Sequence, residues 1–304
     1  MPQHFVAPPQ WEWYIVWYFF LGGLAGGAYA LGAILRLFGD RRDAGVARLA
    51  FLIALPALAI CPILLTLDLG RPLRFWHMLI DPRTMTLHFK YWSPMSVGVW
   101  ALLIFSAFAF LSFLEAVLGE ERFELFRGAF GRILLVLGTI SGLFLAGYTG
   151  VLLSVSNQPI WSDTWTLGGL FLASGLSVAA AALGLLTRLS AGEESTEAKL
   201  SRADLYFIVL ELVLLIAFFV SLGAMGTRLL EPRWLLLWAL VLAGTLVPLV
   251  LRRLSTERRR ESWASVATRV SNAAGTLPSA AVTGATRRAW PVTAAMLARR
   301  SQGS

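Results

Sequence analysis

Seven runs of mostly apolar residues, separated by shorter polar segments, organise this chain. A helix needs about 20 such residues to cross the hydrocarbon core of a bilayer. Lipid offers no partner to free backbone polar groups, so helices are the expected form. The pattern therefore predicts an all-α, polytopic membrane helical bundle, with clear transmembrane helices at residues 13–36, 48–68, 93–117, 130–155, 166–189, 204–227 and 233–252.

The first and fifth spans carry a weak internal repeat. Residues 24–37 and 176–189 place Leu, Leu-Gly and Arg-Leu at matching positions, four spans apart. A duplicated four-span unit predicts two halves that resemble four-helix bundles and meet along small residues. A chance likeness between two small-residue helices remains an alternative. The repeat also predicts an eighth helix, which is missing or degenerate in this sequence.

The composition changes after the last apolar run. From Leu254 onward the chain is rich in Ala, Ser, Thr, Arg and Gly, and its longest uncharged stretch is too polar to insert into a membrane. We therefore expect a membrane domain at residues 1–253. The basic tail of residues 254–304 is expected to be disordered or bound at the membrane surface.

The distribution of positive charge predicts the orientation in the membrane. Of the 26 Lys and Arg residues, ten lie from Arg252 onward, and the remainder favours the loops on the same side as that tail. Positively charged loops stay in the cytoplasm, so the tail is expected there and the N-terminus outside the cell (inner) membrane. The net charge of +8 is then explained by contact with membrane lipid, and no nucleic acid is expected as a partner.

Cysteine and histidine usage limits the redox chemistry that this chain can perform by itself. Cys61 is its single cysteine, which excludes an iron–sulfur cluster and a CxxC zinc site. None of the three histidines, His4, His77 and His88, lies in the middle of an apolar run, so no membrane haem is expected. A Ser-His-Asp triad, a P-loop and a Rossmann fingerprint are also missing. Any electrons must pass through a bound small molecule and a separate partner.

A charged connection between the second and third spans is the first candidate site. It runs Leu-Asp-Leu-Gly-Arg-Pro-Leu-Arg-Phe-Trp-His over residues 67–77. Charges beside hydrocarbon cost a few kcal/mol unless they face a polar cavity, the membrane surface or one another. Asp68, Arg71 and Arg74 are therefore expected to be functional or well paired.

Small residues and one tyrosine suggest how a flat ligand would be held. Gly23 and Gly27 belong to a doubled GxxxG pattern in the first span, which allows close approach of a ring or of another helix. A similar run of small residues occurs in the fourth span, and Tyr148 follows it near the outer end. We expect Tyr148 either to donate a hydrogen bond to the carbonyl of a lipid-soluble ring or to be an ordinary interfacial tyrosine.

Further polar residues could complete the site or move protons. The loop after the fourth span is short and contains Asn157, Trp161 and Asp163, so it is expected either to fold back as a lid or to form a solvated turn. Glu211 in the sixth span and Glu115 at the end of the third are acidic residues at membrane depth. Each is expected either to relay protons or to hold neighbouring helices together.

These motifs together resemble one known family. The segment at residues 67–79, Ser-Pro-Met-Ser at 93–96, Tyr-Thr-Gly-Val-Leu-Leu-Ser at 148–154 and Asn-Gln-Pro-Ile-Trp-Ser-Asp at 157–163 resemble the NrfD-type polysulfide reductase membrane subunits. The likeness spans roughly residues 11–252. Members of that family are haem-free quinone-binding anchors with eight helices in two four-helix bundles. They pair with a ferredoxin-like iron–sulfur subunit and often with a molybdopterin catalytic subunit.

The resemblance implies a function and roles for particular residues. The chain is expected to be the quinone-binding membrane subunit of a respiratory oxidoreductase complex, using menaquinone or ubiquinone. Tyr148 matches the family tyrosine that hydrogen-bonds a quinone carbonyl. Asp68 or His77 would accept protons, and Arg71 would fix the carboxylate. Some relatives carry Asn or His near the ring on the first helix, where this sequence shows only Phe and Gly, so the second carbonyl has no assigned partner.

Two alternatives from other classes remain open at the level of sequence. A transporter built on the duplicated bundle would use the charged connection as a substrate gate. A purely structural anchor would recruit soluble subunits without binding quinone. The terminal substrate belongs to a partner in every case, so the sequence does not identify it.

Overall fold

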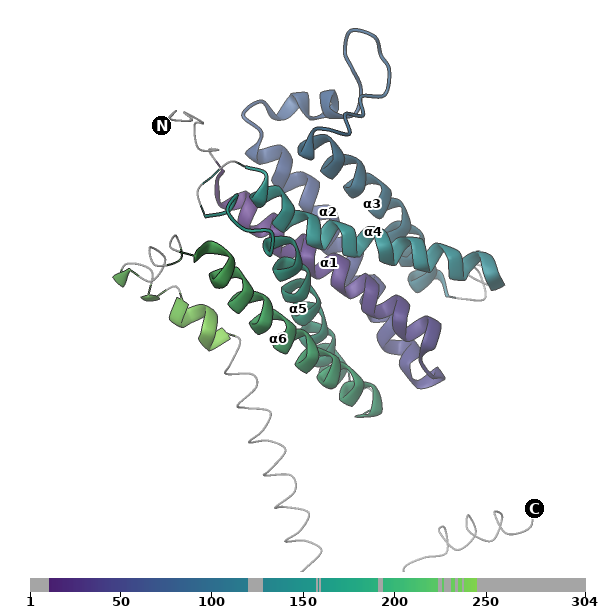
Figure 1. Cartoon of the computed structure of the whole chain (residues 1–304). Helices are drawn as coiled ribbons and strands as arrows, with labels where there is room; N and C mark the ends of the chain where they lie inside the picture. Colours follow the sequence, from purple (N-terminus) through teal and green to yellow (C-terminus); the bar gives the residue numbers. More distant parts are fainter. Residues whose placement is uncertain are drawn as a thin grey trace, which may run out of the picture. The chain divides into compact units, whose positions relative to one another are not determined.

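Six long helices form the part of the chain that the structure describes (Figure 1). The structure is a computed structural model, and it describes residues 11–119, 128–156, 158, 160–190, 194–223, 226, 231, 232, 235, 236 and 238–244. The helices are α1 (Trp13–Phe38), α2 (Ala44–Asp68), α3 (Pro94–Leu118), α4 (Gly128–Ser154), α5 (Leu167–Leu189) and α6 (Glu194–Leu222), with two short 3₁₀ helices, η1 (Arg41–Asp43) and η2 (Pro72–Met78). All six long helices are long and apolar enough to cross a membrane.

The all-α prediction is confirmed, and five of the predicted spans match helices to within a few residues. The exception is α6, which starts at Glu194 rather than at residue 204. Its charged first turns are helical because they pack on η1: the Asp43 carboxylate accepts hydrogen bonds from Thr196 at 2.6 Å and Lys199 at 2.7 Å. The predicted span at 233–252 and the boundary at residue 253 fall largely or wholly outside the described residues.

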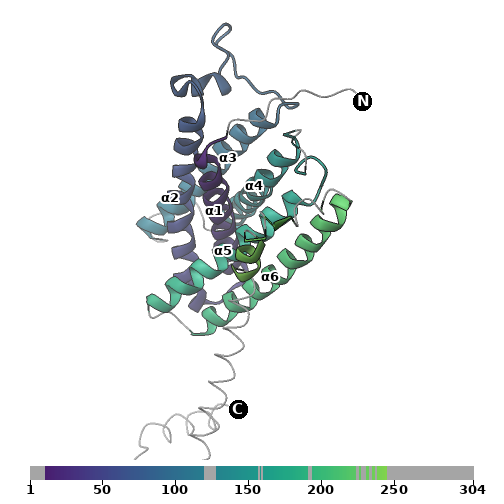
Figure 2. The same ribbon diagram turned by 90° about the vertical axis from the view of Figure 1, so that its left-hand side faces the viewer.

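The first four helices form a closed four-helix bundle. α1 packs on α2 and α4, and α3 completes the ring by packing on both of these neighbours. α5 packs against α1 and α4, and α6 packs against α5 (Figure 2). The bundle agrees with the predicted first half of the repeat. The compact unit that contains these helices ends at Trp238, and residues 239–244 belong to a second unit.

Repeat-related positions touch each other where α1 crosses α5. Gly23 and Gly175 occupy equivalent places in the repeat, and a Cβ built on Gly175 would lie 2.9 Å from the Cα of Gly23. Likewise, a Cβ built on Gly27 would lie 2.9 Å from the Cβ of the equivalent Ala179 and 2.6 Å from the carbonyl oxygen of Gly175. Equivalent surfaces in mutual contact are what a two-fold arrangement of two halves produces. The small residues therefore serve helix packing at this crossing.

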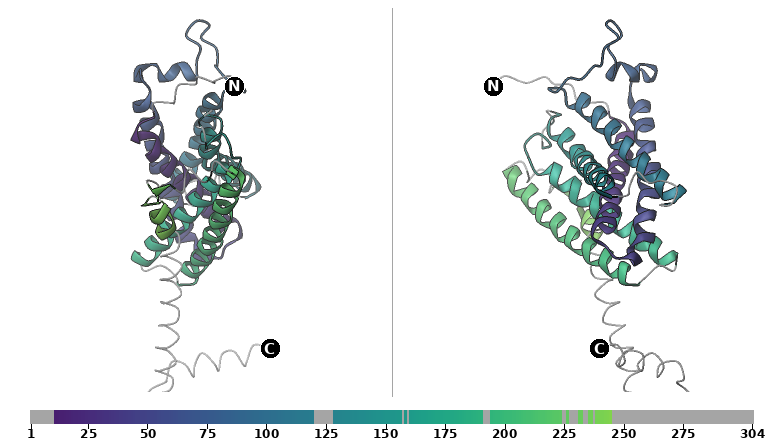
Figure 3. Two further views of the ribbon diagram at one scale, coloured as in Figure 1. Left: turned by 60° about the vertical axis from the view of Figure 1, so that its left-hand side comes forward. Right: turned by 90° about the vertical axis from the view of Figure 1, so that its right-hand side faces the viewer.

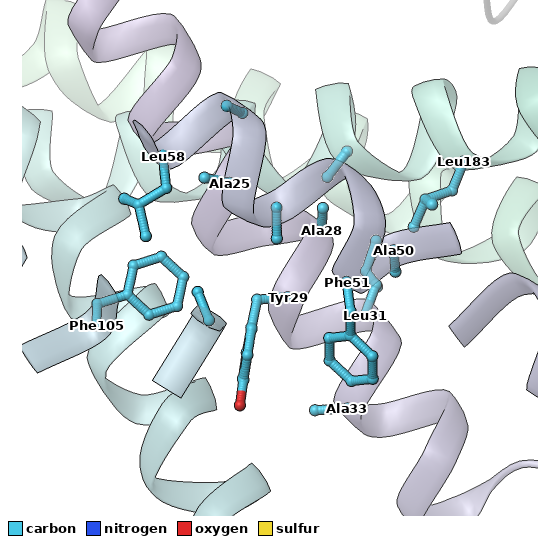
Figure 4. Close-up of a cluster of buried hydrophobic side chains, with 14 of the residues drawn as sticks. Ala25, Ala28, Tyr29, Leu31, Ala33, Ala50, Phe51, Leu58, Phe105 and Leu183 are labelled. Carbon is cyan, nitrogen blue, oxygen red and sulfur yellow. The ribbon is translucent and has the colours of Figure 1, made fainter. Parts of the chain in front are cut away.

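The core of the first bundle is dry and aromatic. Tyr29 lies between Phe51 and Phe105, with ring centroids 5.2 and 5.4 Å away, and its hydroxyl is 2.9 Å from that of Ser112 (Figure 4). Edge-to-face aromatic contacts add about 0.5–1.5 kcal/mol beyond the burial of area. This layer separates the two ends of the bundle with apolar side chains such as Leu58.

The connection between α2 and α3 projects beyond the helix ends (Figure 3). It consists of η2 followed by a turn in which Asp81 N–H donates to the Thr86 carbonyl at 2.9 Å and Ile80 pairs with Leu87 in an isolated bridge. We call this the η2 end of the bundle. There α1, α3 and α5 begin, and α2 and α4 end.

Candidate functional site

A cavity of about 430 Å³ lies at the η2 end of the first bundle. We call it cavity 1, and its walls come from α1, α2, η2, α3 and α4. Its volume falls in the range of roughly 300–1,000 Å³ found for small-ligand pockets, which are mostly apolar with a few polar groups that orient the ligand. The polar side chains on its walls are those of Tyr18, Thr66, Asp68, Ser106 and Tyr148.

Tyr148 is held by two residues of α3. Its hydroxyl donates a hydrogen bond to the carbonyl oxygen of Pro94, the first residue of that helix. Its ring lies over Gly98, because a Cβ built there would come within 2.8 Å of the phenolic oxygen. Phe144, one turn earlier on α4, stacks on the ring with centroids 5.9 Å apart. The glycine at position 98 therefore makes the space that this tyrosine occupies.

Asp68 is the last residue of α2 and joins two helix ends. Its Oδ1 accepts a hydrogen bond of 3.0 Å from the backbone N–H of Glu12, the N-cap residue of α1. A negative charge at a helix N-terminus is favourable. Within the described part of the chain, Oδ2 makes no hydrogen bond, and the residue lines cavity 1. This oxygen is thus available to a ligand.

Tyr18 on α1 is a site residue that the sequence analysis missed. Its side chain is 2% exposed and lines cavity 1, yet its hydroxyl makes no hydrogen bond among the described residues. The hydroxyl is therefore open to cavity 1, where it can bond a ligand. In the sequence, the only indication of this role was that Tyr18 lies one helical turn before Gly22. Gly22 is on the face of α1 that meets Thr149 of α4. That spacing alone does not reveal a cavity.

Two residues expected in the site lie outside it. Arg71 is the exposed N-cap of η2, and no ion pair joins it to Asp68 in the described ranges. The His77 ring packs edge-on against Trp76, with centroids 4.0 Å apart, and is absent from the walls of cavity 1. The described residues thus show no contact by which Arg71 would fix the Asp68 carboxylate, and the roles expected of Arg71 and His77 stay predictions.

Other expected residues border a second cavity on the opposite side of α1. Cavity 2, of about 480 Å³, is lined by Gly23 and by Trp161, whose ring stacks on Trp11 at 6.0 Å. Tyr148 and Asp68 line cavity 1 instead, and the two cavities adjoin at Trp11 and Ile15, which border both. Gly27 is in backbone contact with α5 and leaves no room for a ligand, so the ring sandwich between α1 and α4 is not formed there.

The loop after α4 forms a tight turn at its described positions. The Oδ2 of Asp163 accepts a hydrogen bond of 2.9 Å from the N–H of Ile160. Asp163 thus stabilises its own turn and is on the walls of neither cavity. Asn157 lies outside the described residues.

The two acidic residues expected in a proton path have different surroundings. Glu115 is 2% exposed at the far end of α3 and forms an ion pair with Arg36 of α1. Glu211 is half-buried on α6 and lies near Ser174, which lines cavity 2. Two turns earlier on α6 lies Asp204, which the sequence analysis missed. It is 2% exposed and accepts a hydrogen bond of 2.7 Å from Ser177.

Comparison with known proteins agrees with this architecture. The family model described as "Polysulphide reductase, NrfD" matches residues 2–277. Protein NrfD of Escherichia coli (strain K12) is 28% identical over 236 residues, which cover 70% of this chain and 71% of that protein. The C subunit of the polysulfide reductase of Wolinella succinogenes is 29% identical over 235 residues, 71% of each of the two proteins. The chain is therefore a multi-pass membrane protein that belongs to the polysulphide reductase NrfD family.

Proposed function

We propose that this protein is the quinone-binding membrane subunit of a respiratory reductase complex, and that the ring of the quinone occupies cavity 1. One observation carries the proposal: two tyrosines and a carboxylate line one apolar cavity, and one of these tyrosines, Tyr18, has a hydroxyl that makes no hydrogen bond among the described residues. A lipid-soluble ring with oxygens at opposite ends needs apolar walls and polar groups at both ends. The walls and the polar groups of cavity 1 fit that requirement.

The polar residues of cavity 1 have different roles in orienting the ligand. Tyr148 already donates its one hydroxyl proton to Pro94, so its oxygen accepts a hydrogen bond from a quinol hydroxyl. It donates to a quinone carbonyl only if the bond to Pro94 breaks. Tyr18 is free to donate or accept at the other oxygen, which supplies the partner that the sequence did not identify. Asp68 accepts a proton through Oδ2.

Oxidation of a bound quinol releases two electrons and two protons. In this proposal the protein takes up protons, and a partner subunit accepts the electrons. Asp68 lies at the η2 end, so protons taken up by its carboxylate leave at that surface. The proposal puts the electron-accepting partner at the same end, as an iron–sulfur subunit of the ferredoxin type, with a molybdopterin catalytic subunit beyond it. The Wolinella relative supports a complex of this kind, because its name designates one subunit of a reductase that has several.

We also propose that Glu211 is the proton-relaying acid at membrane depth, rather than Glu115. Glu115 is bound to Arg36, and the aromatic layer around Tyr29 lies between it and cavity 1. Glu211 instead lies near Ser174 on the wall of cavity 2, and its neighbour two turns away is the buried Asp204. Unchanged proton coupling in a Glu211→Gln complex would remove this role.

Substitution of the two tyrosines in the native complex tests the quinone site. Tyr148→Phe and Tyr18→Phe each remove one hydroxyl and leave the apolar walls intact. A lost hydrogen bond costs about 0.5–1.5 kcal/mol, so the Kd for a quinone analogue is expected to rise roughly 2- to 12-fold in each variant. Quinol oxidation should slow at the same time. Tyr206→Phe is the matched control, since that side chain on α6 is 65% exposed. Unaltered binding and oxidation in both variants would exclude cavity 1 as the site.

A further inference from the structure

The 3₁₀ geometry of η2 sorts its side chains into three ridges. In a 3₁₀ helix the side chains at positions i and i+3 are eclipsed. The i to i+3 pattern of η2 is shown by the N–H of Arg74 bonding the carbonyl of Arg71 at 3.0 Å, and by Leu79 bonding Trp76 at 3.0 Å. Seven residues is long for this kind of helix. The side chains of one ridge therefore lie on the same side of η2.

The first ridge faces cavity 1, and the second is an exposed apolar strip. Phe75 and Met78 form the first ridge, and both line the cavity, with Phe75 also 51% exposed at its edge. Leu73 and Trp76 form the second and are 88% and 37% exposed. A large aliphatic side chain and a tryptophan on one exposed strip, in a connection beside the ends of membrane helices, are typical of a segment that lies in the bilayer interface.

The third ridge is basic. It consists of Arg74 and His77, and the N-cap residue Arg71 directly precedes the helix; both arginines are exposed. Neither arginine has an ion-pair partner within the part of the chain that the structure describes. The nearby Asp81 does not serve them, because it caps its own turn through the N–H of Arg83 at 2.8 Å. The ridge thus presents two uncompensated positive charges next to the apolar strip.

We propose that this basic ridge of η2 binds the phosphate of an anionic phospholipid headgroup, with Leu73 and Trp76 in the adjoining acyl region. A guanidinium binds phosphate in a bidentate manner, and two arginines one 3₁₀ turn apart bracket a single phosphate group. The neighbouring apolar strip favours a lipid over the acidic surface of a soluble protein, because a phospholipid supplies both a phosphate group and acyl chains. The bound lipid holds η2 in place as one wall of cavity 1.

Lipid binding to the full-length protein tests the proposal without any redox assay. Phosphatidylglycerol is titrated onto the detergent-solubilised protein, and retained lipid is counted by native mass spectrometry. At about fivefold per arginine, Arg71→Gln combined with Arg74→Gln is expected to weaken binding roughly 30-fold. Arg83→Gln is the matched control, since it removes a cation of the same connection that is not on the ridge, and it should change binding less than twofold. Phosphatidylcholine, which lacks net charge, should bind more weakly to wild type.

Each other outcome has a definite meaning. Equal retention of phosphatidylglycerol by the double variant and the wild type would overturn the proposal. So would a double variant that keeps its lipid but loses its partner subunits, because the ridge would then be a protein-docking surface. If the double variant does not fold, wild-type binding decides: it should weaken steeply between 50 and 500 mM salt, with the screening length falling from about 14 to 4 Å. Salt-independent binding would count against a phosphate contact.

Discussion

Replacement of Gly98 by alanine is expected to disable cavity 1 with a single methyl group. The new Cβ would lie 2.5 Å from Cε1 of Tyr148 and 2.8 Å from its hydroxyl oxygen. Non-bonded carbon atoms prefer about 3.5–4.0 Å, so the ring must retreat by about 1 Å. α3 cannot yield easily, because its backbone carries the methyl group. The buried tyrosine therefore moves, and its hydrogen bond to Pro94 is strained or lost.

The size of the effect follows from known costs of overpacking. An added methylene in a packed site costs about 1–3 kcal/mol. If this cost destabilises the conformation that binds the ligand, the Kd for a quinone analogue rises roughly 5- to 150-fold. Quenching of tryptophan fluorescence measures this Kd, since Trp11 lines the cavity. The control is Gly184→Ala, where a Cβ would meet nothing within 4 Å. A Kd for Gly98→Ala within twofold of wild type would refute the reasoning.

Three further predictions concern stability. Gly27→Leu is expected to lower the free energy of unfolding by about 1–3 kcal/mol, because its Cβ would lie 2.6 Å from the Gly175 carbonyl oxygen. A thiol-reactive dye reports unfolding through the single, buried cysteine. An unchanged melting temperature would contradict the close packing of α1 on α5. Glu115→Gln removes the buried negative charge of the Arg36 ion pair and should cost up to about 3–5 kcal/mol in the same assay. A loss below 1 kcal/mol would show that the pair is solvated. The backbone N–H of Arg83 lowers the pKa of the Asp81 carboxyl. The turn at residues 81–86 should therefore loosen only when the pH falls below the ordinary range of an aspartate. Hydrogen exchange in the turn that does not change with acid, or that changes equally in Asp81→Asn, would contradict this.

The membrane fold was predictable because hydrophobic length is a local property. Each of the six described helices needs enough consecutive apolar residues to cross the bilayer, and the sequence shows this directly. The start of α6 was not predictable in this way, since seven of its first ten residues are polar. These residues are helical because Thr196 and Lys199 bond Asp43, more than 150 residues away. Contacts at that separation leave no periodic pattern in the sequence.

The sequence by itself determined the family, the class of fold and the two residues Asp68 and Tyr148 that meet in cavity 1. Motifs and apolar runs suffice for these, because they depend on residue identity and local spacing. Only the tertiary structure decided which polar residues share a cavity. The expected site residues are spread over two adjoining cavities: Asp68 and Tyr148 line one together with Tyr18, and Gly23 and Trp161 line the other. The reason is that the rotation of a helix about its axis is set by packing at its crossings, here the glycine contacts of α1 with α4 and α5, and not by the residues that face the ligand.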